Sequence, residues 1–260
     1  MNFEYWYVFP YAIFVCIMAN ISGFSGSVLF QPFFNFVLGV PIAQSIATGI
    51  ATETIGMTSG SIGHWRAKNG TDVRAVKTVV PFVLAGVFSG LFLFVFLPKL
   101  YLRLLVGVVI FFIASYQLYL TFKGNTGYYD RADLAVLRTF NSRVKQFFAG
   151  VGSASTGTGV AEMHQPMFEQ DAGLKNKRAN ASAILIEAMS NWLITFFNLS
   201  IGNLRFDILI FSAAGVAIGG QIGPFLTKYV PDKVGKAFFG LSVCFIGIIY
   251  IVTSVQKLLG

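Results

Sequence analysis

Two glutamates, Glu53 and Glu187, lie at matching places in stretches that are almost free of charge, and they are the residues best suited to chemistry. Between Tyr5 and Gly63, Glu53 is the only charged side chain. A carboxylate inside an apolar segment is costly and usually faces a cavity or a partner. The pair is therefore a candidate for coupling to a proton or another cation. A place near a helix end, or a hydrogen bond to a neighbouring hydroxyl, would explain each glutamate without such a function.

A second set of polar groups lies in two Gly-rich stretches, 23–32 and 157–166, which both end in Gln-Pro. They offer hydroxyls, amides and free backbone N–H groups, which are the donors that an oxyanion needs, and a half-helix N-terminus would add a favourable dipole. The alternative is a polar helix contact that binds no ligand. The candidate ligand-binding side chains are Ser25, Ser27, Gln31, Thr158, His164 and Gln165.

Three further polar features allow two interpretations or have a structural one. His164 could carry a proton or bind a ligand, because its charge changes near neutral pH, or it could be a bonded structural residue. Asn20 and Asn191 could line a site or join two helices through a hydrogen bond. His64 begins a His-Trp-Arg run that is typical of an anchor at the membrane interface.

The composition indicates that these groups are held inside a membrane. Of the 260 residues, 55% are hydrophobic and 12% are charged, and the mean hydropathy is +0.69. A soluble domain has about 25% charged residues. The net charge of +8 comes from basic residues in short interhelical stretches, as in the cytoplasmic loops of membrane proteins. We therefore expect a multi-pass protein of the cell (inner) membrane, with lipid as a partner and no nucleic acid.

No cofactor, metal ion or catalytic apparatus is expected. Cys16 and Cys244 each lie alone in an apolar segment, as buried small side chains do, and no His or Cys spacing suits a metal. The first few residues lack the basic start of a cleaved signal, so we expect the first apolar segment to be structural. The protein is predicted not to be an enzyme.

The apolar pattern predicts an all-α protein. Four segments have the length of a membrane span, namely 75–97, 102–121, 207–227 and 234–257. The others are 5–22, 27–39, 42–63, 145–161 and 179–198. The segment 27–39 is too short to span, and it follows Gly residues and contains Pro32. Such a segment is typical of a broken or re-entrant helix, whose backbone must face protein or a water-filled cavity.

An internal repeat organises these segments. At a shift of 134 residues, Gln31-Pro32 matches Gln165-Pro166, Gly23 matches Gly157, and Glu53 matches Glu187. At a shift of 133, the matches are Gly86 with Gly219, Gly90 with Gly223, Pro98 with Pro231, and Gly107 with Gly240. We therefore predict a first membrane repeat at 1–121, a polar linker at 122–144 and a second membrane repeat at 145–260.

The distribution of Lys and Arg predicts that the two repeats are inverted. The loop 64–77 carries four basic residues, whereas its counterpart 198–206 carries Arg205 alone. The next loop has the opposite bias, with Lys99 and Arg103 against Lys228, Lys233 and Lys236. Basic loops tend to stay inside. The predicted fold is thus an all-α, polytopic membrane protein of two inverted structural repeats, with broken or re-entrant helices near the midplane.

The order of these motifs resembles that of a known family. A Gly-rich turn at 22–27 is followed by an apolar run to Pro32, an Ala-Thr helix, the run His64-Trp-Arg-Ala-Lys-Asn-Gly70, and Leu97-Pro98 with a Gly-containing span. This pattern resembles the TauE/SafE (sulfite exporter, or TSUP) family over nearly the whole chain. The resemblance implies transport of a small sulfur-containing anion: sulfite, a sulfonate, sulfoacetate or thiosulfate.

The chain also departs from that family pattern. Glu162 and His164 stand where the family is usually apolar, and Glu53 and Glu187 are not positions associated with it. We expect a secondary transporter, coupled to protons or cations by alternating access, with Glu53 and Glu187 as coupling residues. The rival hypotheses are a passive anion channel and a membrane-embedded enzyme or assembly factor. The sequence leaves the exact substrate and a homo-oligomeric state open.

Overall fold

The computed structural model describes residues 3–123 and 133–259, which form a helical bundle with no strand among them. Its α-helices are α1 (Val8–Ser22), α2 (Ser27–Pro32), α3 (Ile42–Arg66), α4 (Val73–Phe96), α5 (Lys99–Lys123), α6 (Phe140–Thr156), α7 (Val160–Pro166), α8 (Asn176–Ser200), α9 (Phe206–Leu226) and α10 (Asp232–Leu259). The described residues also include short 3-10 or π segments, namely η1 (Phe3–Tyr5), η2 (Phe33–Val37), η3 (Leu134–Arg138) and η4 (Met167–Asp171). The prediction of an all-α fold is confirmed.

The four predicted spans are confirmed as long apolar helices. In the described part of the chain, α4, α5, α8, α9 and α10 are long and apolar enough to cross a membrane. Large aromatic side chains, such as Phe92 on α4, Phe112 on α5 and Phe245 on α10, lie exposed on their outer faces. An apolar outer surface of this kind is what a lipid environment requires.

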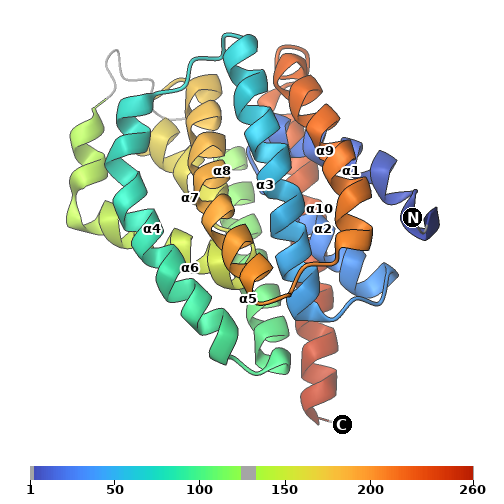
Figure 1. The fold of residues 1–260 in the computed structure, drawn as a ribbon. Coiled ribbons are helices and arrows are strands. Elements are labelled where there is room, and N and C mark those ends of the chain that lie inside the picture. The colour runs from blue at the N-terminus through green and yellow to red at the C-terminus, as the bar shows by residue number, and fades with distance from the viewer. Residues whose placement is uncertain (1–2, 124–132, 260) are drawn as a thin grey trace.

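The helix α3 is as long as α8, but it is not among the helices that are apolar enough to cross a membrane by composition alone. Its Thr, Ser and Gly residues are buried instead, and α3 and α8 occupy the middle of the bundle (Figure 1). Figure 1 also shows α4 and α6 on one side of this centre and α1 and α9 on the other. Close approach to α9 depends on glycine, because a Cβ added at Gly63 would lie 2.6 Å from the Gly220 carbonyl oxygen. Small residues commonly allow membrane helices to pack this closely.

Both halves contain the same order of elements. In each, a helix of 15 or 17 residues is followed by a short helix ending in Pro, a π segment of five residues, and a helix of 25 residues. Two long helices then complete each half. The linker predicted at 122–144 lies partly outside the described residues, and α6 begins within it.

The α-helical geometry of each short helix ends at its proline, but the helical path of the chain continues beyond it. The chain continues past Pro32 and Pro166 as π turns, in which Leu38 N donates to the Phe33 carbonyl and Ala172 N to the Met167 carbonyl. Proline removes one helical donor, and a wider turn accommodates that loss. The actual break comes before each short helix, at Gly23 and Gly157.

Candidate functional site

The two Gly-rich turns meet inside the bundle. Gly23 ends α1 and Gly157 ends α6, and both adopt left-handed backbone angles, with φ of 75° and 74°. Glycine takes this conformation at little cost, so the chain can turn sharply into α2 and α7. The Oγ of Ser25 lies 3.2 Å from the Gly157 carbonyl oxygen, and Ser27 Oγ also donates to that oxygen. The two turns are therefore in direct contact in the fold.

Two glutamines bridge the turns reciprocally. Gln31 Nε2 donates to the carbonyl oxygen of Thr156, 2.8 Å away. In the amide orientation that satisfies both of its ends, Gln165 donates to the carbonyl oxygen of Ser22 at 3.2 Å. Each glutamine thus binds the last helical carbonyl before the other turn. These contacts account for the position of both glutamines, and they leave Gln31 Oε1 buried without a described partner.

Ser25 connects two carboxylates. Its Oγ donates to Glu53 Oε2 at 2.6 Å, and its backbone N–H donates to Glu162 Oε1 at 2.8 Å. Asn191 Nδ2 adds a contact of 3.3 Å to Glu53 Oε2, so this asparagine lines the cluster. All four residues are buried.

Glu162 occupies a cradle of hydrogen-bond donors. Besides the Ser25 N–H, its carboxylate accepts from Thr158 Oγ1 at 3.0 Å and from the Gly159 N–H at 3.0 Å. Three donors from both turns therefore converge on one oxyanion, and that oxyanion belongs to the protein itself. In the sequence, Glu162 stands out only as a departure from the family pattern, and no role was predicted for it. The repeat could not point to it, because the matching residue at a shift of 134 is Val28.

Glu187 has a different environment, although its position matches that of Glu53. It is fully buried, and neither carboxylate oxygen has a hydrogen-bond partner among the described residues. Glu53 and Glu162 are near enough to act on it electrostatically. Glu53 Oε1 is likewise buried without a described partner. Burial of an unpaired charge is very unfavourable, so these oxygens require a proton or a partner.

The two histidines lie apart from this cluster. The Nδ1 of His164 bonds the Val160 carbonyl within α7 at 2.8 Å, while its Nε2 is buried without a described partner. His64 is 1% exposed and bonds Asn69, so its prediction as an interface anchor is wrong. The same Asn69 amide also donates to the Pro224 carbonyl of α9, whereas the adjacent Trp65 is 78% exposed and fits that role.

A cation is present beside each turn. In the same amide orientation of Gln165, Lys236 Nζ donates to the Gln165 side-chain oxygen at 3.3 Å, and it pairs with Glu169 at 3.1 Å. In the first half, the guanidinium of Arg103 lies over the Phe36 ring at 4.8 Å. Arg103 and Lys236 match at a shift of 133 residues. These basic groups flank the turns and do not contact the three carboxylates.

The centre is closed in this structure. The cavity beside Glu53 has a volume of about 10 Å³ and is lined by Cys16, Gly56 and Val216, among others. A single water needs at least about this volume. Among the described residues, no group of three or more His, Cys, Asp or Glu side chains is arranged to hold a metal ion.

Comparison with known proteins gives the family. A family model described as sulfite exporter TauE/SafE matches residues 8–250, which is nearly the whole chain. No curated protein and no solved structure matches the chain. The match covers both halves and agrees with the resemblance in the motifs. The chain is a multi-pass membrane protein and belongs to the sulfite exporter TauE/SafE family of transporters.

Proposed function

We propose that the protein is a secondary transporter that moves a small sulfur-containing anion together with protons. The substrate class is sulfite, a sulfonate, sulfoacetate or thiosulfate. The observation that carries the proposal is the cradle in which Ser25, Thr158 and Gly159 donate to the Glu162 carboxylate. A carboxylate and a sulfur oxyanion need the same kind of donors, so the cradle suits either.

In this proposal, Glu162 holds the place of the substrate while the site is closed. Protonation of Glu162 would weaken its charge-assisted bonds and release the donors to an incoming anion. Glu53 and Glu187 must also be neutral at that moment, because an anion beside ionised carboxylates would be repelled in a low-dielectric interior. Anion binding and proton binding then favour each other, which is the basis of cotransport.

Alternating access would follow from the two inverted repeats, with α2 and α7 as re-entrant helices that meet at the substrate. The recurring order of elements, the reciprocal Gln31 and Gln165 contacts and the opposite bias of basic loops support this arrangement. The helices of the first half and those of the second half would then move as two bodies around the turns. By the same bias, the loop between α3 and α4 would face the cytoplasm.

Ligand binding can be tested by thermal stabilisation of the purified protein. The panel comprises sulfite, sulfate, thiosulfate, sulfoacetate, taurine and simple carboxylates, each at neutral and mildly acidic pH. A ligand that binds the native state raises its apparent stability. We expect a rise with a sulfur anion, larger at the lower pH, that Thr158→Ala reduces, because this change removes the side-chain hydroxyl among the three donors of the cradle. Ser212→Ala is the control, because Ser212 is also buried and hydroxyl-bonded, but its side-chain partner is Thr52 and not a residue of the cradle.

Transport can be tested in proteoliposomes with sulfoacetate and a pH-sensitive dye in the lumen. The sulfonate group stays ionised over the working range, so its own protonation adds little to the signal. Saturable uptake with acidification of the lumen is the expected result. A flux that rises linearly with concentration and moves no protons would instead indicate a passive channel.

A further inference from the structure

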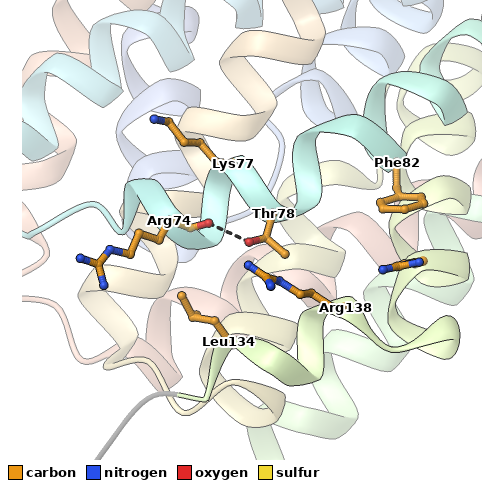
Figure 2. Close-up of a pocket in the computed structure, with 7 residues that line it drawn as sticks. Arg74, Lys77, Thr78, Phe82, Leu134 and Arg138 are labelled. Atoms are coloured by element: carbon orange, nitrogen blue, oxygen red, sulfur yellow. Dashed lines mark hydrogen bonds between the residues drawn. The ribbon is translucent and has the colours of Figure 1, made fainter.

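A cavity lined by basic side chains lies at the start of α4, away from the central cluster. A cavity of about 580 Å³ is lined by Arg74, Lys77, Thr78, Phe82, Leu134, Arg138 and Arg143. Figure 2 shows Arg74 and Thr78 on α4 facing Leu134 and Arg138 on η3. The elements α4, η3 and α6 thus contribute four basic side chains to one hollow.

The positive charge of this cavity is uncompensated within the described part of the chain. None of the four cations forms an ion pair there. The nearby acids have other partners: Asp72 caps α4 and pairs with Arg178 at 2.9 Å, and Asp133 caps η3. Four like charges around one hollow repel each other and attract an anion.

The cavity also has an apolar side, which a soluble anion would not require. The guanidinium of Arg143 lies over the Phe82 ring, 5.0 Å from its centroid. One turn further along α6 comes Phe147, followed by Phe148, which is exposed on the outer face. Phe82 and Leu134 thus add apolar lining to the basic cavity, and aromatic side chains follow it along α6. A phospholipid has the same sequence of charged headgroup and apolar chains.

We propose that this cavity binds the phosphate headgroup of an anionic phospholipid, with its acyl chains along the exposed faces of α4 and α6. Basic pockets between membrane helices near the interface commonly bind such headgroups. Arg138 and Arg74 would contact the phosphate oxygens, and Arg143, held flat by Phe82, would contact the headgroup from below. This site is separate from the proposed substrate site and does not depend on it.

The test is native mass spectrometry of the detergent-purified protein, titrated with phosphatidylglycerol or phosphatidylcholine. We expect one saturable site for phosphatidylglycerol and weaker binding of phosphatidylcholine. Each of Arg74→Gln, Arg138→Gln and Arg143→Gln should weaken phosphatidylglycerol binding about fivefold. Arg143→Lys keeps the charge but loses the flat contact with Phe82, and it should weaken binding less than Arg143→Gln.

The control is Lys228→Gln, which removes a charge at the same end of the bundle, beyond α9. It should change the affinity by less than about twofold. Melting temperatures in lipid-free detergent verify that the variants are folded, which their exposed positions favour. Equal binding of both lipids would overturn the proposal. Unchanged binding by a variant that combines Arg74→Gln, Arg138→Gln and Arg143→Gln would do the same. So would saturation of the cavity by inorganic phosphate or glycerol phosphate with no competition from phosphatidylglycerol, because the site would then serve a soluble anion.

Discussion

Gln31 Nε2 donates to the carbonyl oxygen of Thr156 across 2.8 Å, although 125 residues separate the two in the chain. This bond places the Gln31 amide against Gly157, where a Cβ would overlap it. Gln165 has the matching relationship with Gly23. The glycine of each turn is therefore required twice, once for its backbone angle and once for the space that it leaves.

Gly157→Ala should lower the stability more than Gly70→Ala. Both glycines have positive φ, 74° and 77°, so each substitution costs about 1–2 kcal/mol in backbone strain. A Cβ at Gly70 would meet nothing within 4 Å, whereas at Gly157 it would overlap Gln31 and add about 1–3 kcal/mol. Melting temperatures in detergent compare the two variants. The double variant Gln31→Ala/Gly157→Ala should recover part of the loss, and equal effects of both single substitutions would contradict the packing argument.

Glu162→Gln should raise the affinity for the sulfur anion at neutral pH about tenfold and reduce its pH dependence. The amide keeps one acceptor oxygen but lacks the charge that competes for the three donors. A tenfold change corresponds to about 1.4 kcal/mol, which is within the range for one bond to a charged group. Titration of the melting temperature with sulfoacetate at two pH values measures both effects.

Glu162→Asp is the matched comparison, because it keeps the charge on a shorter side chain. It should retain the pH dependence of binding. If Glu162→Gln bound sulfoacetate with the affinity and pH dependence of the unmodified protein, the carboxylate would not compete with the substrate.

Glu53→Gln and Glu187→Gln should each reduce the number of protons moved with every anion. A neutral amide is less costly to bury than a carboxylate, so neither variant should melt much below the unmodified protein. Glu187 has no hydrogen bond to lose among the described residues, and its variant should be the better tolerated. Lumen acidification divided by sulfoacetate uptake gives the ratio. An unchanged ratio in both variants would remove these glutamates from the coupling mechanism.

Much of this architecture could be predicted because it depends on local pattern and on the repeat. The matched Gly, Gln-Pro and Glu positions located both turns and both central helices, and the long apolar runs located the spans. Apolar length alone is enough to define such helices in a membrane. The repeat could be recognised because both halves must build the same turn, with a left-handed glycine and a glutamine that faces the other half.

Features that depend on contacts specific to one half could not be predicted. Glu162 lies opposite Val28 in the repeat, and only the fold brings the Ser25 N–H to its carboxylate. His64 has the type and neighbours of an interface residue, yet it is buried and bonded to Asn69, which also bonds the Pro224 carbonyl of α9. The basic cavity combines α4 with η3 and α6, which are separated from α4 in sequence by α5 and residues 124–132.

Lys236 and Glu169 provide a final prediction, on the ion pair that fixes α10 against the second turn. Their 3.1 Å contact is largely buried, with side-chain exposures of 13% and 10%. Lys236→Gln would remove the lysine partner of Glu169 from a largely buried contact and should cost up to about 3 kcal/mol, because breaking a buried pair loses its charge compensation. Lys236→Gln/Glu169→Gln should cost less than the sum of the two single substitutions, as expected for residues in direct contact.

Lys233→Gln, at an exposed position one turn earlier, is the control and should stay within about 0.5 kcal/mol. Additive losses in the double variant would mean that the pair contributes no coupling energy and that α10 is held by its apolar contacts alone.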